Sequence, residues 1–275
     1  MEVALKEGKY LYCIIESNQY QIFGPLGIGD RGDELYTVSF NDIAVVVSNA
    51  PIKKYVVSRE NTIAHEKAVE EVMKKYTVLP VRFSTIAEDE EKVEKILEKE
   101  YDKFKDLLGK MKGKKELGLK AIFKEDVIYE DILEKHEGIR VLKEKVAALP
   151  PEKTYYQRME IGKMVEVALQ KEKEICEEDI INTLLPLAVE VKTNNPYGER
   201  MIVTAAFLVN EDKEAEFDKK VGELDAKYSD KIKFKYVGTI PPFNFVNLII
   251  ETGRQIMVAA APVHRSKLYG NFFPA

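Results

Sequence analysis

The segment from Gly24 to Gly32 has the spacing that comes nearest to a ligand-binding motif. It contains G-I-G-D-R-G at residues 27–32, which matches the letters of the dinucleotide-binding fingerprint. In that fingerprint a helix follows the glycines, so that its N-terminal amides face the pyrophosphate. Here the following residues, DELYTVSF, have a strand pattern, and the segment contains no Walker lysine. The spacing therefore favours a turn loop, and a nucleotide or ligand site on it is the alternative.

The three histidines and two cysteines do not form a metal or catalytic motif. His65-Glu66 begins like the zinc-binding helix of metalloproteases, but position 69 is Val, so the second histidine is missing. We therefore expect His65 to be a buried structural side chain. Cys13 and Cys176 lie far apart and are expected to act as small hydrophobic residues in a reducing compartment. No catalytic residue, metal or cofactor is predicted, and the protein is expected not to be an enzyme.

Composition restricts the class of protein further. The 275-residue chain has 45% hydrophobic and 32% charged residues, with a formal net charge of −5. Acidic and basic residues are mixed along it, so there is no basic patch for nucleic acid. No apolar run approaches the ~18 residues that a membrane helix needs, and the first residues lack the apolar core of a signal peptide. We expect a soluble, cytoplasmic protein with neither nucleic-acid nor membrane partners.

Hydrophobic patterns in the first half of the chain predict a small α+β domain with the order β-β-β-α-β-α. Ser58 can cap its first helix, and a charged helix is expected from about Glu88 to Met111. Asn41-Asp42 predicts a hairpin between the second and third strands. The expected strands are KYLYCIIE (9–16), ELYTVSF (34–40), IAVVVS (43–48) and TVLPVRFST (77–85).

The second half predicts a ferredoxin-like βαββαβ domain with an enlarged helical first crossover. That crossover is expected to be broken at Pro150-Pro151, after which Thr154-x-x-Gln157 reads as a capping box. The helix after this box has an approximate apolar stripe of Met159, Ala168, Leu169, Ile175, Cys176 and Ile180. The expected strands are ELGLKAIFK (116–124), LAVEVKTN (187–194), ERMIVTAAFLV (199–209) and KIKFKYVG (231–238).

The best domain boundary is GKMKGKKE (109–116), where glycines and lysines replace any apolar period. The fold class is therefore α+β with two domains, at residues 1–112 and 113–246. Residues 247–275 form a C-terminal extension, expected either to pack on its own domain or to contact a partner.

Arg82 lies in LPVRF, between two apolar neighbours that point to the opposite face of the strand. Pro80 places this strand at or near a sheet edge, because proline cannot donate to a neighbouring strand. We expect Arg82 to pair with a carboxylate that stabilises the N-terminal domain.

Pro241 and Pro242 follow the last predicted strand and should end it, after Gly238 allows a bend. In an extended chain Phe243 and Phe245 would point the same way. One hypothesis buries both rings in the core between the two domains. The other gives Pro241, Pro242, Phe243 and Phe245 a partner-binding role, as an apolar surface.

Six stretches, taken together in order, resemble the gas vesicle GvpF/GvpL family. They are YLYCII (10–15), DIAVVVS (42–48), TVLPVRFSTI (77–86), KELGLKAIF (115–123), TAAFLV (204–209) and GTIPPFNFV (238–246). The chain departs from the usual family pattern at three places. Ser84 stands where glycine is usual, Thr239-Ile240 where Pro-Trp is common, and Phe243 where tyrosine is common.

This resemblance implies a minor structural or assembly protein of gas vesicles that is not an enzyme. Its implied partners are the main shell protein GvpA and other accessory gas vesicle proteins. Its implied location is the gas-facing side of the shell, in a gas vesicle within the cytoplasm. The resemblance also implies the two-domain α+β organisation with a ferredoxin-like second domain. The competing hypothesis is a ferredoxin-like regulatory module that binds a nucleotide or ligand at the Gly24–Gly32 loop.

Overall fold

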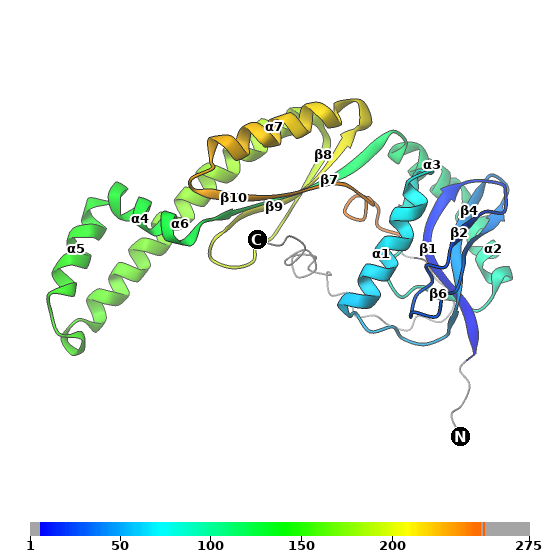
Figure 1. The fold of residues 1–275 in the computed structure, drawn as a ribbon, viewed down its shortest axis with the longest axis horizontal. Coiled ribbons are helices and arrows are strands. Elements are labelled where there is room, and N and C mark those ends of the chain that lie inside the picture. Colours follow the sequence, from blue (N-terminus) through cyan, green and yellow to red (C-terminus); the bar gives the residue numbers. More distant parts are fainter. Residues whose placement is uncertain (1–5, 249, 251–275) are drawn as a thin grey trace, which may run out of the picture. The chain divides into compact units, whose positions relative to one another are not determined.

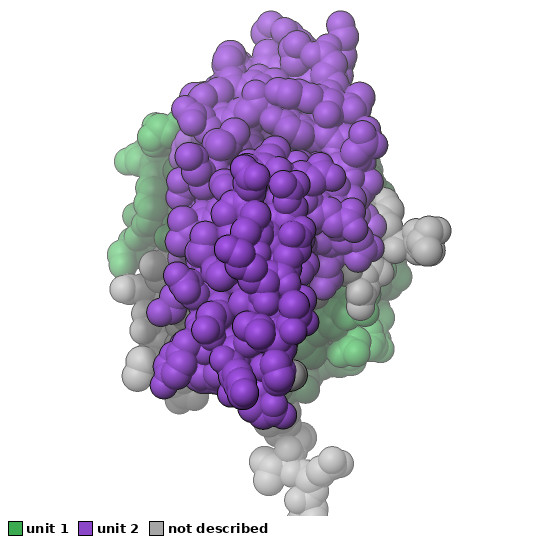
Figure 2. Space-filling view, turned by 90° about the vertical axis from the view of Figure 1, so that its left-hand side faces the viewer, with its two compact units in different colours: residues 1–116, 239–275 green, residues 117–238 purple. Residues whose placement is uncertain are grey.

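The computed structural model describes residues 6–248 and residue 250. The chain forms two compact units, which Figure 2 shows in different colours. The first unit ends at Glu116 and resumes at Thr239, whereas the second unit is Leu117–Gly238. Residues 239–246, which we expected in the second domain, therefore group with the first, where a turn is bound to Glu116. The predicted extension, apart from residues 247, 248 and 250, lies outside the described residues.

The first unit contains an antiparallel sheet in the order β2-β3-β4-β1-β5, with β6 also paired to β1. Its central strands β1 and β4 are buried along nearly their whole length, as their continuous apolar sequences predict. The β3–β4 hairpin is confirmed, and Asn41 adopts φ 52° at the turn. The strands are β1 Glu7–Glu16, β2 Ile22–Gly24, β3 Leu35–Phe40, β4 Ile43–Pro51, β5 Val78–Pro80 and β6 Ile86–Ala87.

Three helices belong to the first unit: α1 Arg59–Met73, α2 Glu90–Lys99 and α3 Tyr101–Met111 (Figure 1). The predicted cap of α1 is confirmed, because the Ser58 hydroxyl accepts the Asn61 amide at 3.2 Å. The single helix expected from Glu88 to Met111 is wrong. Glu100 leaves the helical region, with φ −109° and ψ 16°, and this break separates α2 from α3. The interruption lets each short helix aim its own apolar residues at the core.

The second unit has a four-stranded sheet in the order β10-β7-β9-β8. With strands numbered along this unit, the order is 4-1-3-2, as a ferredoxin-like βαββαβ domain requires. Figure 1 shows α7 lying along this sheet and α5 with the first half of α6 extending beyond it. The elements are β7 Lys114–Phe123, α4 Glu125–Lys135, α5 Glu137–Ala147, α6 Tyr155–Leu184, β8 Ala188–Asn194, β9 Met201–Asn210, α7 Glu214–Lys227 and β10 Ile232–Ile240, with 3-10 turns at Pro151–Lys153, Leu185–Leu187 and Glu211–Lys213.

The enlarged crossover consists of three helices, because α4 and α5 separate at His136. The break at Pro150-Pro151 is confirmed, but the capping box at Thr154 is wrong. The Thr154 hydroxyl accepts a hydrogen bond from Arg158 Nε at 3.0 Å instead of an amide of the helix end. Within the predicted stripe of α6, Met159 and Ile175 are exposed. Met159 lies in the first half of the helix, which extends past the sheet, whereas Ile175 lies beside the buried Cys176 on a different face of the helix.

A cluster of ion pairs joins α4, α6 and the residue before β10. Lys231 Nζ lies 2.5 Å from Glu172 and 3.1 Å from Asp131, and Lys135 contacts the same two carboxylates. Although burial raises the pKa of Asp131 and Glu172, hydrogen bonds from the two lysines outweigh it and lower both pKa values. The cluster thus links the helical crossover to the edge of the sheet.

None of the helices in residues 6–248 combines the length and apolar character needed to cross a membrane.

Candidate functional site

The candidate segment Pro241–Phe245 forms a tight turn at the end of β10. The two prolines end the strand as predicted, although β10 continues past Gly238 to Ile240. The amide of Phe243 donates to the Pro241 carbonyl at 2.7 Å, and that of Phe245 donates to the Pro242 carbonyl at 3.1 Å. The expectation of an extended chain is therefore wrong, since these bonds curl the backbone into a turn with Phe243 and Phe245 on either side of Asn244.

Glu116 holds this turn from the first residues of β7. Its side chain is fully buried and accepts the Asn244 amide at 3.0 Å. The second carboxylate oxygen of Glu116 accepts the Asn244 side-chain amide. A charged acceptor strengthens both bonds, so the turn is fixed to a strand that precedes it by more than a hundred residues. Sequence reasoning missed Glu116, and its only signal was a carboxylate beside the apolar run LGLKAIF.

Phe243 packs on an aromatic cluster of the first unit. Its ring centroid lies 5.9 Å from that of His65, whose ring is also 5.6 Å from Tyr10 and 5.8 Å from Phe83. His65 is 1% exposed, and its Nε2 lies 3.1 Å from the Val81 carbonyl oxygen. The expectation of a buried structural histidine is therefore confirmed. Phe243 contributes to the first unit's own core while remaining half-buried.

Two buried tyrosines tie this cluster to neighbouring loops. The Tyr10 hydroxyl accepts the Ser84 amide at 2.8 Å, and the Tyr12 hydroxyl accepts the Ile28 amide at 2.7 Å. Burial raises the pKa of Tyr12 to about 12 and that of Tyr10 well above its ordinary value. Both therefore stay protonated at neutral pH and serve as structural hydrogen-bonding groups. Both tyrosines lie in a strand predicted from the sequence, but its pattern did not indicate that their hydroxyls would bond to loops.

The half-buried residues Phe243, Asn244 and Phe245 form what we call the aromatic turn. Pro241 and Pro242 are buried beneath it. All four predicted residues thus lie in one turn, with both prolines buried and Phe243 and Phe245 half-buried. The two phenylalanine side chains of the turn are apolar groups of the kind that protein contacts use.

Ser84 and Arg82 occupy the loop that leads from β5 to β6. Ser84 has φ 67°, a left-handed conformation in which glycine is at ease and other residues are strained. Its hydroxyl accepts the Tyr55 amide at 3.3 Å. Arg82 is exposed and forms no ion pair with a carboxylate of the described residues, so the predicted pairing is wrong. The edge position inferred from Pro80 is confirmed, because β5 is the last strand in the order of the sheet.

The Gly24–Gly32 loop leads into strand β3, as its sequence context predicted. Three of its amides already have acceptors, because Leu26 donates to the Gly24 carbonyl at 3.0 Å, Gly27 donates to the Asp33 carbonyl at 2.9 Å and Ile28 donates to Tyr12. A side chain at position 27 would lie 2.7 Å from the Asp33 carbonyl oxygen, so that glycine serves a close backbone approach. Ile28 is fully buried. The loop is thus a packed turn, and the close backbone approach explains the glycine at position 27 without a ligand.

A concavity of about 910 Å³ lies over the first unit's sheet. Inside it, Lys9 Nζ donates to the Tyr36 hydroxyl at 2.6 Å and to Asn49 at 2.7 Å. The Tyr36 hydroxyl donates to Glu90 at 2.7 Å, and this bond, with one from Lys9, lowers the pKa of the Glu90 carboxyl. These polar groups bind one another, which explains the network as a structural link between the sheet and α2.

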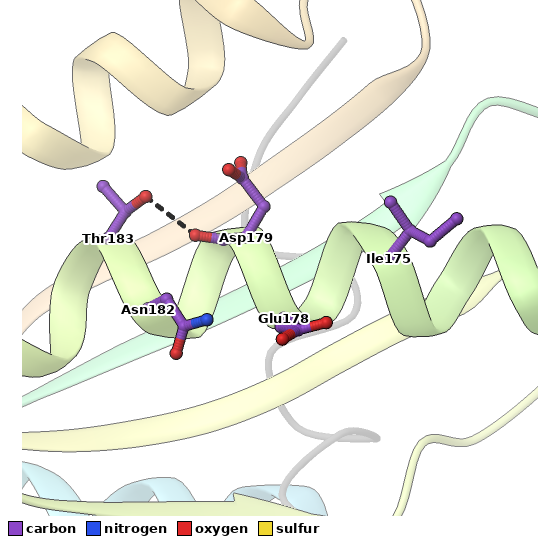
Figure 3. A pocket seen from close by; sticks show the side chains of 5 residues that line it. All are labelled: Ile175, Glu178, Asp179, Asn182 and Thr183. Atoms are coloured by element: carbon purple, nitrogen blue, oxygen red, sulfur yellow. Dashed lines mark hydrogen bonds between the residues drawn. The ribbon is translucent and has the colours of Figure 1, made fainter.

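A second concavity, of about 380 Å³, lies on the second unit and is lined by Ile175, Glu178, Asp179, Asn182 and Thr183 of α6 (Figure 3). The Thr183 hydroxyl donates to the Asp179 carbonyl at 2.7 Å. The Asp179 carboxylate accepts Lys227 and the Tyr228 hydroxyl, each at 2.8 Å. Since every lining residue belongs to one helix, no groups converge on a ligand, and we assign none.

Comparison with known proteins gives a consistent result. A family model described as gas vesicle synthesis protein GvpL/GvpF matches residues 8–247. Gas vesicle protein F of Dolichospermum flosaquae is 26% identical over 211 residues, covering 76% of this chain and 85% of that protein. Gas vesicle protein F of Nostoc sp. (strain PCC 7120) is 26% identical over 249 residues, covering 89% of this chain and all of that protein (100%).

Two solved structures are similar to the fold described above. The crystal structure of GvpF from Anabaena sp. PCC7120 has a TM-score of 0.74 and 25% identity, and covers 88% of this chain and 99% of that one. The crystal structure of GvpF from Microcystis aeruginosa has a TM-score of 0.68, with the same identity of 25% and the same coverage of 88% and 99%. The likeness therefore extends over both units.

Proposed function

Since the chain belongs to the GvpL/GvpF family of gas vesicle synthesis proteins, and therefore has a gas vesicle-related role, we propose that it is a non-enzymatic assembly protein. In this proposal it binds the main shell protein GvpA and other accessory gas vesicle proteins. It acts at the gas-facing side of the shell, in a gas vesicle within the cytoplasm. The family resemblance inferred from the six sequence motifs is confirmed, and the partners and the location are the proposed part.

The single observation that carries the proposal is the aromatic turn. A fully buried carboxylate, Glu116, fixes the backbone of a turn whose two rings are only half-buried. Holding apolar side chains at the surface in one conformation lowers the entropy lost on binding. Aromatic residues are also those that most often dominate the energy of protein–protein contacts. The turn is therefore suited to recognising an apolar surface on a shell protein.

The two rings contribute differently, which allows folding and binding to be separated. Phe243 packs against the His65 cluster, so shortening it removes core contacts as well as surface. Phe245 lies at the other end of the turn and outside that core cluster, so it is the residue to vary first. Burying one such ring is worth roughly 1.5–3 kcal/mol, which corresponds to about a ten- to hundredfold change in affinity.

The experiment is co-purification of the tagged chain with GvpA, followed by titration of the purified proteins. We expect Phe245→Ala to weaken GvpA binding about tenfold or more while circular dichroism stays native. Tyr20→Ala is the matched control, because Tyr20 is an aromatic residue of the same unit that is 67% exposed. Unchanged binding by Phe245→Ala and by the double variant with Phe243→Ala would show that the aromatic turn is not the contact.

The competing ligand-binding hypothesis is tested with the same protein. Titration calorimetry with ATP and NAD should show no binding at micromolar concentration, because the amides of Leu26, Gly27 and Ile28 in the Gly24–Gly32 loop already donate internally. The neighbouring carboxylates of Asp33 and Glu34 would also repel phosphate groups. Micromolar nucleotide binding that is lost in Gly29→Val would favour the ligand-binding hypothesis instead.

A further inference from the structure

Strand β8 lies at one edge of the second unit's sheet. Within residues 6–248 it pairs with β9 alone, so among these residues its other edge carries no strand. Five of its seven residues are exposed, including Val189, whose side chain is 53% exposed. An open strand edge presents unpaired amide and carbonyl groups that can add another strand.

The side chains of β8 alternate between two faces of the sheet. Val191 is opposite Phe207 and packs against the core under the helices. Glu190 is opposite Leu208 and Lys192 is opposite Ala206, so both charged side chains lie on the other face. Glu190 and Lys192 contact each other along the strand at 3.3 Å. On the face away from the helices, β8 therefore carries an acidic and a basic residue, one on each side of Val191.

We propose that β8 is a self-complementary edge that pairs antiparallel with β8 of a second copy of this chain. A two-fold axis at Val191 would place each Val191 opposite its equivalent. Glu190 of each copy would then face Lys192 of the other, giving two cross-strand ion pairs on the same face. The four-stranded sheets would join into one continuous sheet of eight strands.

The charges select this register over its neighbours. An axis at position 190 would place two glutamates opposite each other, and an axis at position 192 would oppose two lysines. Like charges directly opposite each other destabilise a strand pair, whereas opposite charges stabilise it. The register at Val191 also keeps the helix-covered faces of both sheets on one side. The proposal concerns a surface on the second unit and does not depend on the aromatic turn.

The test is a pair of charge reversals whose products should bind each other. Lys192→Glu gives a strand with two acidic residues, and Glu190→Lys gives one with two basic residues. Each variant alone should dimerise about tenfold or more weakly than the wild type, because both cross-strand pairs become repulsive. An equimolar mixture restores every pair and should form a heterodimer of wild-type affinity. Sedimentation velocity over a concentration series measures all three states.

The control is Lys219→Glu, a reversal at an exposed position of α7, which should leave dimerisation unchanged. Raising the salt concentration should weaken the wild-type dimer, because both ion pairs are exposed. Circular dichroism should be native for every variant, since both residues lie at the surface. A wild-type chain that stays monomeric at about 200 μM, well above the micromolar range of weak complexes, would overturn the proposal. So would reversals that dimerise as the wild type does, or a mixture that fails to associate.

Discussion

Replacing Asn244 by alanine tests whether the contact with Glu116 holds the aromatic turn. Asn244 gives two donors to a fully buried carboxylate, its backbone amide at 3.0 Å and its side-chain amide. Alanine removes the second donor and keeps the first. A hydrogen bond to a charged group contributes about 1.5–3 kcal/mol, so the free energy of unfolding should fall by roughly that amount. The melting temperature should fall by roughly 3–12 °C, at about 2–4 °C per kcal/mol.

The assay is thermal unfolding followed by circular dichroism, combined with amide hydrogen exchange across residues 241–246. Asn244→Asp is the matched control, since it keeps the shape and replaces the amide by a second carboxylate. At pH 7 this variant should be less stable than the alanine variant, and it should recover as acid protonates one of the two carboxylates. An alanine variant that melts within about 1 °C of the wild type, with unchanged exchange, would refute the reasoning, since the loss expected per kcal/mol is larger.

Other predictions concern Ser84, Arg82 and the ion cluster of Lys231. Ser84→Gly should be more stable than Ser84→Ala by about 1 kcal/mol in urea unfolding, because both lack the hydroxyl and only glycine relieves the left-handed backbone. Equal stabilities of the two variants would show that the left-handed backbone at position 84 is not strained. Arg82→Ala should change the free energy of unfolding by less than about 0.5 kcal/mol, because the side chain is exposed and lacks a carboxylate partner among the described residues. A larger loss of stability in thermal unfolding would show that a partner exists. The lowered pKa values of Asp131 and Glu172 stabilise the fold above their ordinary values of 3.8 and 4.5, so this stability is lost as pH falls below about 5. Lys231→Met should therefore show a smaller drop in melting temperature between pH 6 and pH 3 than the wild type, and an equal drop would count against the cluster.

The order of elements could be predicted because it depends on local patterns. The alternation in KIKFKYVG and the continuous apolar run in ERMIVTAAFLV are both strands in the structure. The cap at Ser58 was also predictable, since the capping bond joins residues three apart. The break at Glu100 was not, because the residues on both sides keep a helical pattern and the interruption is decided by packing.

The candidate site was predictable in its location but not in its geometry. Pro241 and Pro242 marked the end of a strand, and their rings could be seen to fix the backbone. The turn itself depends on Glu116, which lies 128 positions before Asn244, and no local pattern reports such a contact. The exposed position of Arg82 could not be predicted for the same reason. The fold, and not the neighbouring residues, decides whether a carboxylate lies within reach of its side chain.

The division of the first unit into two segments has a consequence for the synthesis of the protein. Ribosomes complete the second unit, at Gly238, before they add the turn that Glu116 binds. All strands of the first unit's sheet are made before the second unit, but until the turn is added the Glu116 carboxylate lacks the Asn244 donors. A nascent chain released before residue 244 would carry a finished second unit beside an incomplete first one. Glu116 therefore gains its Asn244 donors only after the whole of the second unit has been synthesised.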